Sequence, residues 1–407
     1  MSQKAYDIIL WGATGFTGRL VAEYIVDNYS DADLSWAMAG RNKEKLLSVQ
    51  KEIGAEHIPT IIADSHDRSS LDKMTSRGSV ICTTVGPYAK YGSHLVASCI
   101  QSGTDYCDLT GEVQWMRKMI DEHHQEAKNK GVRIVHNCGF DSVPSDMGVY
   151  FLQEQMKDSH GEYAEHIKMR VKALKGGMSG GTYASLSYVM EEAAQNQEIY
   201  KILFDPYGLN PKEGPRGQDK PDLQKVIYDK DARSWIAPFI MAAINTKVVR
   251  RSHALSGHPY GTSFRYDEAM LTGDGIGGRM KGYATAAALG VLMLGKPGSM
   301  LKKLTDKVLP DPGEGPNKSQ RDNGFYNLRF YGKMKDGSIH VAKVTGDKDP
   351  GYGSTSKMLA EAAICLAKDK SSCPDVAGML SPATALASPY LKRLNDNAGL
   401  TFEMVSD

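Results

Sequence analysis

A run of residues near the start of the chain has the composition of a phosphate-binding turn. Its three glycines, in GxxGxxG spacing, follow an apolar segment of strand type and precede a segment of helical periodicity. The first glycine of such a turn permits a tight bend, the second lets the backbone approach a diphosphate, and the third brings helix and strand close together. Free N–H groups at the helix N-terminus would bind the diphosphate of a dinucleotide. The residues are Gly12, Ala13, Thr14, Gly15, Phe16, Thr17 and Gly18.

The end of the next strand-like segment, residues 34–39, bears on which dinucleotide is bound. An acid there would accept hydrogen bonds from the ribose 2′-OH of NAD, whereas a cation tolerates the 2′-phosphate of NADP. No acid occupies that place, and Arg41 can contact a phosphate in bidentate fashion. The alternative is that Arg41 and Lys43 are solvated residues at a helix start, with Glu44 as partner. We predict NADP(H), with Asp64 after the third strand as a candidate partner of the adenine amino group.

The fourth strand-like segment ends in Val85, Gly86 and Pro87. Ligands of doubly wound sheets lie outside the carboxyl ends of the strands, so we expect these residues to line the nicotinamide. The alternative is an ordinary Gly-Pro turn. Hydride chemistry also needs a proton donor near the cofactor. The candidate catalytic residues are Asp141, Tyr88 and Ser142, of which Asp141 is the proposed proton donor.

Several polar residues near the same sheet edge have structural interpretations instead. Asp108, Thr110 and Glu112 are placed to cap a helix that begins near Val113. A single histidine in an apolar run, His136, is typical of a hydrogen-bonded core residue. Cys107 and Cys138 have nothing nearby in sequence that would lower their pKa values, so we expect them to be packing residues.

The elements that would hold these residues alternate in βαβ fashion as far as residue 137, which predicts a Rossmann-type doubly wound parallel sheet. We expect this dinucleotide-binding domain over residues 1–145. After it the alternation stops, and a mixed α/β substrate domain is expected over 146–345, followed by a C-terminal helical segment, 346–407, that packs back on the first domain. The six predicted strands are 7–11, 34–39, 58–63, 80–85, 104–108 and 132–137.

Within the second half, a strand is expected over 167–174 and helices over 182–196 and 356–367. Pro/Gly-rich loops are expected over 205–221 and 310–324. Asp336-Gly337 lies between two strand-like runs, which predicts a hairpin.

The apolar stretch 283–294 is too short to cross a bilayer as a helix. A buried core helix is the first interpretation. The wall of an acyl pocket is the functional alternative, and a membrane-surface element helped by Lys296, Lys302 and Lys303 is the third.

The composition is that of an ordinary globular protein. Of 407 residues, 41% are hydrophobic and 24% charged, and 49 basic against 48 acidic residues leave a formal charge of +1. This balance gives no global field to attract nucleic acid, and we expect no nucleic-acid partner. The six cysteines show no zinc-ligand spacing, so no metal site is expected and a reducing, cytoplasmic location fits best. The apolar run at the N-terminus is too short for a signal peptide.

Two long strings, DLTGE within residues 103–112 and GFDSVPSD over residues 139–146, resemble the saccharopine-dehydrogenase-like oxidoreductases. The resemblance spans nearly the whole chain and implies a Rossmann domain followed by an α/β substrate domain. The subgroup to which the chain is most similar includes the trans-acting enoyl reductases, which reduce an α,β-unsaturated acyl chain for a polyketide synthase. Further strings of the same kind lie at 12–18, 85–88, 179–182, 310–316 and 349–353.

We therefore expect an NADP(H)-dependent oxidoreductase that transfers hydride to an unsaturated, acyl-linked substrate or to an imine. An acyl-carrier or synthase partner, a peripheral membrane contact and a homodimer are expected with it. One alternative is a non-catalytic nucleotide-binding scaffold at a lipid or synthase surface. Another is an amino-acid dehydrogenase of saccharopine type, for which Arg250, Arg251 and Arg265 are candidate substrate ligands by residue type only. An Arg250-Arg251 pair is more typical of a solvated face.

Overall fold

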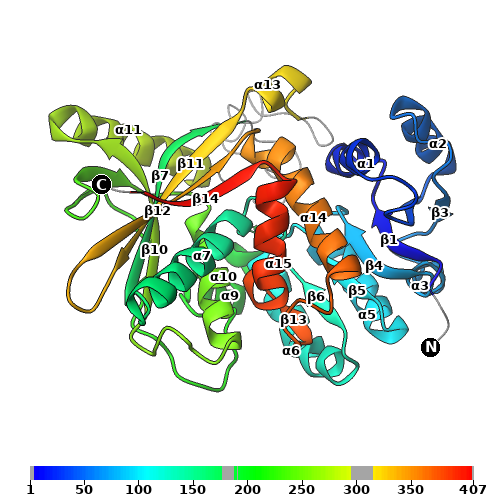
Figure 1. The fold of residues 1–407 in the computed structure, drawn as a ribbon, viewed down its shortest axis with the longest axis horizontal. Helices are drawn as coiled ribbons and strands as arrows, with labels where there is room; N and C mark the ends of the chain where they lie inside the picture. The colour runs from blue at the N-terminus through cyan, green and yellow to red at the C-terminus, as the bar shows by residue number, and fades with distance from the viewer. Residues whose placement is uncertain (1–3, 177–187, 190, 295–314, 406–407) are drawn as a thin grey trace. The chain divides into compact units, whose positions relative to one another are not determined.

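The computed structural model describes residues 4–176, 188–189, 191–294 and 315–405, and the chain divides into two compact units (Figure 1). Unit 1 comprises Met1–Val143, Ala184–Met190 and Gly351–Gly399. Unit 2 comprises Pro144–Tyr183, Glu191–Pro350 and Leu400–Asp407. Several predicted features lie outside the described residues: the motif at 179–182, residues 310–314 of the next motif, residues 182–187 and 190 of the helix predicted over 182–196, and Lys296, Lys302 and Lys303.

Unit 1 is built on a seven-stranded, all-parallel sheet of order β13-β6-β5-β4-β1-β2-β3. The six strands predicted from the sequence are confirmed, and β13 is an addition that its three residues did not reveal. The order reverses between β1 and β4, which is the switch point where such sheets bind ligands. The strands are β1 (Tyr6–Trp11), β2 (Trp36–Gly40), β3 (Thr60–Ile62), β4 (Gly78–Thr83), β5 (Asp105–Cys107), β6 (Arg133–Val135) and β13 (Gly378–Leu380).

The helices of unit 1 cover strands that are mostly apolar. β2, for example, is buried along its whole length, as expected of a parallel strand with both faces covered. The predicted helix over 356–367 is confirmed as α14, which packs on α1 and against β1, β4 and β5. The helices are α1 (Phe16–Asn28), α2 (Lys43–Glu52), α3 (Arg68–Thr75), α4 (Tyr88–Tyr91), α5 (Ser93–Ser102), α6 (Val113–Asn129), α14 (Thr355–Lys368) and α15 (Pro382–Asp396), with a π-helical turn at Pro350–Ser354 before α14.

Unit 2 is built on a seven-stranded mixed sheet of order β14-β12-β11-β7-β10-β9-β8, in which β7 and β10 are parallel and the other pairs antiparallel. The hairpin predicted at Asp336-Gly337 joins β11 to β12, and the positive φ of Gly337 suits its turn. The strands are β7 (His166–Lys175), β8 (Ile227–Asp229), β9 (Ser234–Ala237), β10 (Arg265–Gly273), β11 (Phe325–Lys333), β12 (Ile339–Gly346) and β14 (Leu400–Val405). The helices are α7 (Val143–His160), α9 (Gln197–Phe204), α10 (Ala242–Leu255), α11 (Gly275–Leu294) and α13 (Lys318–Asp322).

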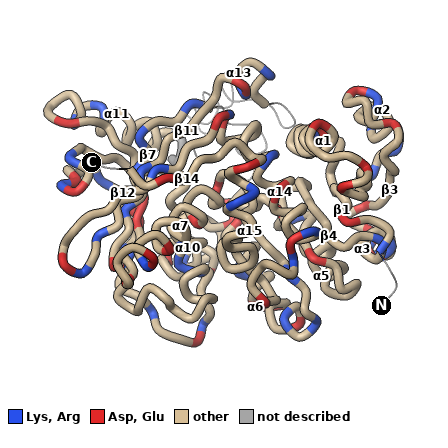
Figure 2. Tube along the Cα trace, in the orientation of Figure 1, with Lys and Arg blue, Asp and Glu red and all other residues tan. Residues whose placement is uncertain are grey.

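The mixed sheet buries charged side chains in its interior. Arg170 on β7 is only 2% exposed and forms ion pairs with Asp229 and Asp267, each at 2.7 Å. The expectation of a solvated Arg250-Arg251 pair is wrong, because both side chains are buried on α10. Figure 2 shows that basic and acidic residues are interspersed along the chain, in keeping with the balanced net charge.

The apolar stretch that begins at Tyr283 lies on α11, and its interpretation as a buried core helix is wrong. Tyr283 and Val291 are 49% and 44% exposed. The reason is that α11 packs on β9 and β10 through only one face, where Gly278 and Gly282 lie against the sheet. A Cβ atom on Gly278 would lie 2.1 Å from the carbonyl oxygen of Gly273. Among the described residues, no helix is both long and apolar enough to cross a membrane.

Candidate functional site

The phosphate-binding turn has the geometry that its glycines predict. Gly12 has φ +95°, and a Cβ atom there would lie 2.7 Å from a methyl carbon of Val85. A Cβ atom on Gly18 would lie 2.1 Å from the Gly12 carbonyl oxygen, so helix α1 can approach β1 only with glycine at this position. Gly15 is exposed, and a Cβ atom there would meet only the Gly12 carbonyl oxygen, at 3.4 Å.

The N-terminus of α1 has features that favour an anion. Gly15 is the N-cap residue, it makes no side-chain cap bond, and the first turn of the helix holds no acid. The first-turn N–H groups and the helix dipole therefore favour a phosphate beside Gly15. The turn itself is held by a hydrogen bond from Gly15 N to Gly12 O at 2.9 Å, and Thr84 Oγ1 donates to Gly12 O at 3.3 Å. Ala13 and Thr14 complete the turn between β1 and α1, and Phe16 and Thr17 are the first residues of α1.

Arg41 directly follows β2 and is exposed. No hydrogen bond or ion pair holds its guanidinium within the described residues, and no ion pair joins it to Glu44. The start of α2 is capped instead by Asn42, whose side chain accepts from Lys45 N at 2.8 Å. Arg41 is thus free to contact a phosphate. Asp64, after β3, is half-buried and accepts a hydrogen bond from His66 N at 2.8 Å.

The segment after β4 is fixed by a carboxylate that comes from the segment after β5. Glu112, 1% exposed, accepts hydrogen bonds from Tyr88 N and Ala89 N, each at 2.8 Å. The helix-capping interpretation of Glu112 is wrong: it is the N-cap residue of α6, but its side chain makes no cap bond there. By holding the first turn of α4, Glu112 orients Val85, Gly86 and Pro87 at the sheet edge.

Asp108 is a structural clamp between β5 and β6. One carboxylate oxygen accepts from Tyr106 Oη at 2.9 Å and contacts His136 Nδ1 at 2.7 Å. The other oxygen accepts from Thr110 N at 3.1 Å and Asn137 N at 3.2 Å. This network confirms His136 as a hydrogen-bonded core residue.

Asp141 lies in the segment between β6 and α7, and its carboxyl group does not take part in the Asp108 network. It is partly exposed and has no hydrogen-bonding or ionic partner among the described residues. Desolvation raises its pKa to about 6. Its Oδ2 lies 3.7 Å from the position that a Cβ atom on Gly111 would take. The segments that follow β5 and β6 thus meet here, at the carboxyl edge of the sheet, and a carboxyl with this pKa can donate a proton near neutral pH.

The other two candidate catalytic side chains point into the protein. Tyr88 is 4% exposed, and its hydroxyl donates to Thr83 O at 3.2 Å, while its ring stacks on Trp115. Ser142 is fully buried, and its hydroxyl donates to the carbonyl oxygen of Asp141. These contacts suit positioning of the segment rather than contact with a substrate.

The cysteines near the sheet edge are buried and free, and burial raises the pKa of the Cys107 thiol well above its usual value. This supports packing roles rather than nucleophilic catalysis.

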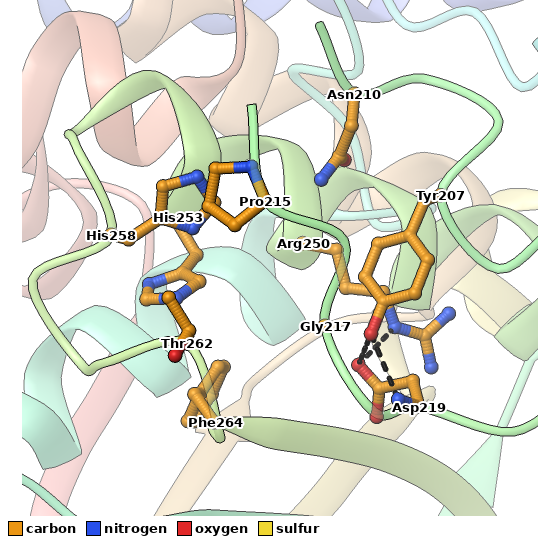
Figure 3. Close-up of a pocket in the computed structure, with 10 residues that line it drawn as sticks. All are labelled: Tyr207, Asn210, Pro215, Gly217, Asp219, Arg250, His253, His258, Thr262 and Phe264. Carbon is orange, nitrogen blue, oxygen red and sulfur yellow. Dashed lines mark hydrogen bonds and ion pairs between the residues drawn. The ribbon is translucent and has the colours of Figure 1, made fainter. Parts of the chain in front are cut away.

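Unit 2 contains a small hollow around Asp219, on which Tyr207 and Arg250 converge (Figure 3). Tyr207 Oη lies 3.1 Å and Arg250 Nε 2.8 Å from Asp219 Oδ2. The free space is about 10 Å³, enough for about one water molecule. Arg250 is already neutralised here, and Arg251 donates to the Leu209 carbonyl, so neither is free to hold a substrate carboxylate.

Another carboxyl with a raised pKa lies in unit 2, and this one is buried. Glu268 on β10 accepts from Tyr266 Oη at 2.7 Å and from Asn245 Nδ2 at 3.0 Å. Burial raises its pKa to about 7. Unlike Asp141, it is fully satisfied and enclosed.

Comparison with known proteins agrees with this geometry. Residues 8–135 match the family model described as saccharopine dehydrogenase NADP binding domain. A Mycobacterium tuberculosis protein named provisionally as a trans-acting enoyl reductase is 39% identical over 411 residues, which covers 96% of each chain. The chain belongs to the saccharopine-dehydrogenase-like family. A further member, named trans-acting enoyl reductase, from Mycobacterium ulcerans is 35% identical, with 97% of this chain and 96% of that protein covered.

Membership of this family makes the chain an NADP-dependent oxidoreductase, and the predicted cofactor is confirmed. The fold class is confirmed as well: the apo saccharopine dehydrogenase (L-Glu forming) of Saccharomyces cerevisiae shares the fold, with a TM-score of 0.54, 15% identity, and coverage of 98% of this chain and 99% of that one.

The residues of this family member fit the cofactor on structural grounds. The N-terminus of α1 and the exposed Gly15 suit a diphosphate, and the exposed guanidinium of Arg41, which has no partner in the part of the chain that the structure describes, suits a 2′-phosphate. Sequence reasoning missed Glu112 as the residue that fixes the segment after β4. The position of Glu112 in the DLTGE string could have marked it as important. The string does not reveal its partners, Tyr88 and Ala89, which lie 24 and 23 residues earlier in the chain.

Proposed function

We propose that this protein uses NADPH to reduce the carbon–carbon double bond of an α,β-unsaturated acyl thioester. One observation carries the proposal: Asp141, whose carboxyl group has no partner among the described residues and a pKa of about 6, lies in the same unit as the phosphate-binding turn and at the same sheet edge. The substrate class is supported by full-length similarity to relatives named trans-acting enoyl reductases.

The cofactor would be held by residues that follow β1 to β4 in the sheet. The first-turn amides of α1 bind the diphosphate, Arg41 binds the 2′-phosphate, and Asp64 accepts from the adenine amino group. Val85, Gly86 and Pro87, which Glu112 holds in place, line the nicotinamide. NADPH supplies a hydride when bound.

Asp141 supplies the proton. As hydride adds to Cβ of the enoyl group, the π electrons move toward the thioester carbonyl, and the carboxylic acid of Asp141 transfers its proton to Cα. Asp141 is left as a carboxylate and is reprotonated from solvent, to which it is partly exposed. The hydride from NADPH, which carries one hydrogen and two electrons, and the proton from Asp141 together complete the saturated acyl chain.

We also propose that the acyl chain is delivered by a separate acyl carrier of a synthase. The names of the relatives describe enzymes that act in trans, which supports delivery by a partner chain. The buried, engaged state of Arg250 and Arg251 argues against an amino-acid substrate with several carboxylates.

The test is oxidation of NADPH in the presence of 2-enoyl thioesters of increasing chain length, with mass spectrometry of the acyl product. We expect saturated product from at least one chain length, and no turnover with lysine and 2-oxoglutarate. Turnover of the amino-acid pair with no enoyl reduction would replace this proposal by saccharopine-type chemistry. Tight NADPH binding without turnover of either substrate would favour a nucleotide-binding scaffold.

A further inference from the structure

Helix α11 has a continuous stripe of exposed apolar side chains on the face opposite the sheet on which it packs. Ile276, Met280, Tyr283 and Val291 are 83%, 65%, 49% and 44% exposed. These positions follow each other at i, i+4, i+7 and i+15, so they share one face of the helix. Exposed alanines at 284, 287 and 288 fill the gaps between them. The stripe, Ile276 to Val291, is about 22 Å long at the rise of an α-helix.

The opposite face of α11 fixes the direction of this stripe. A Cβ atom on Gly282 would lie 2.7 Å from a methyl carbon of Val226, and the Gly278 contact with Gly273 is closer still. These glycines press the helix against the segments beside β8 and β10. The residues that follow Val226, Ile227 and Tyr228, are 45% and 41% exposed on edge strand β8. They add apolar surface beside the helix.

The charges on α11 are all of one sign. Its only charged side chains are Arg279 and Lys281, both exposed. No ion pair with an acid holds either of them within the part of the chain that the structure describes. The Arg279 guanidinium lies 5.2 Å from the ring centre of Trp235 and 5.8 Å from that of Tyr283. Cations and amphipathic aromatic rings thus border the apolar stripe.

We propose that this stripe docks on an anionic lipid surface. The apolar side chains would enter the acyl boundary, Tyr283 and Trp235 would lie at headgroup depth, and Arg279 and Lys281 would reach anionic headgroups. The helix lies on the bilayer rather than crossing it, because its other face is covered by the protein. A second copy of the chain fits this surface less well, since α11 itself brings two cations to the contact, against the single acid Asp274 that precedes the helix and is already engaged with Tyr228.

The test is flotation of the full-length protein with vesicles of phosphatidylcholine alone and of phosphatidylcholine with phosphatidylglycerol. We expect binding to the anionic vesicles that weakens with salt, and about a tenfold or greater loss of binding in Met280→Glu and in Ile276→Glu. Arg279→Ala and Lys281→Ala should each weaken binding by about fivefold, the equivalent of roughly 1 kcal/mol per cation near an anionic surface. The matched control is Leu47→Glu on α2, since Leu47 is 48% exposed and outside the stripe.

Absence of binding to anionic vesicles by the unaltered protein would overturn the proposal, as would equal binding by Met280→Glu. Light scattering measures the oligomeric state and so tests the alternative that a second copy of the chain covers the stripe. A dimer that Met280→Glu converts to a monomer would show that a second copy covers the stripe, and the lipid proposal would then be wrong. NADPH binding by each variant checks its folding, because none of these residues is placed in the cofactor site. Vesicle binding needs no acyl substrate, so its failure leaves the proposed reductase activity unaffected.

Discussion

The two sheets of this protein differ in where most of their important charged residues lie. In the parallel sheet of unit 1, strands such as β2 are wholly apolar, and the charged residues that matter lie in the segments after the strands, as Arg41, Glu112 and Asp141 do. In the mixed sheet of unit 2, charged residues such as Arg170 lie within the strands and are buried in ion pairs. Of the charges at the edge of unit 1, Arg41 and Asp141 can reach a ligand and Glu112 positions a segment, whereas Arg170 inside unit 2 is engaged in structural ion pairs.

The largest expected effect is on stability and belongs to the mixed sheet. Arg170→Met leaves the buried Asp229 and the half-exposed Asp267 with fewer partners, and the uncompensated charge of Asp229 is expected to lower the free energy of unfolding by about 3 kcal/mol. The matched change in unit 1, Arg41→Met, removes an exposed cation and should change stability by less than about 0.5 kcal/mol. Urea unfolding of both variants measures this difference. Equal losses of stability in Arg170→Met and Arg41→Met would contradict the proposed difference between the two sheets.

Asp141→Asn is expected to lower kcat for enoyl reduction by about 10²- to 10⁴-fold, because the side chain can no longer donate a proton. NADPH affinity should stay unchanged. In the unaltered protein the rate should fall as the pH rises above about 6, as Asp141 loses its proton, and the variant should lack that fall. Steady-state kinetics against pH measure both effects. Retention of the pH profile in Asp141→Asn would remove Asp141 from the mechanism.

Arg41→Ala should reduce the affinity for NADPH by about 10- to 100-fold, the value of charge-assisted bonds to one phosphate, and leave NADH affinity unchanged. Calorimetric titration with both coenzymes measures the ratio of the NADPH affinity to the NADH affinity. The neighbouring cation gives a control: Lys43→Ala should change the ratio much less. If Lys43→Ala instead abolishes the preference, the phosphate site has been assigned to the wrong residue.

Glu112→Gln tests a residue that acts through its neighbours. Replacing one carboxylate oxygen by an amide nitrogen costs one of the two N–H contacts to Tyr88 and Ala89, so we expect the KM for NADPH to rise about tenfold. The KM for the acyl substrate should stay unchanged. A merely structural role predicts a lower melting temperature with both KM values unchanged.

The smallest effect concerns Glu268, the buried carboxyl of unit 2. Its pKa of about 7 in the folded protein lies above the unfolded value, so the folded state binds more protons and stability falls as the pH rises. Between about pH 6 and pH 7.5 the loss should be about 1 kcal/mol. Glu268→Gln should flatten most of this slope, and urea unfolding at several pH values measures it. An unchanged slope would show that other groups set the pH dependence.

The same contrast explains what could be read from the sequence. The parallel strands and the phosphate-binding turn were predictable because apolar runs, glycine spacing and helix starts are local signals. Strand β13 escaped notice because it has only three residues and pairs with β6 from far along the chain. Glu112 was expected to cap the helix next to it, but its partners come from the preceding β4 segment.

In unit 2 the usual link between polarity and exposure fails in both directions. Arg250 and Arg251 look solvated in sequence and are buried, because α10 supplies them to Asp219 and to a main-chain carbonyl. The apolar α11 looks like core and is exposed, because its glycine face is the one that fits the sheet. Which face an element buries depends on its partners, and periodicity alone does not name them.

The most direct test of the central claim is transfer of deuterium from NADPH labelled at C4 of the nicotinamide to a 2-enoyl thioester. The account predicts saturated product with one deuterium at Cβ, from one of the two C4 diastereomers only, and a proton from solvent at Cα. Product without deuterium, or NADPH that is bound but never oxidised by any enoyl thioester, would contradict it.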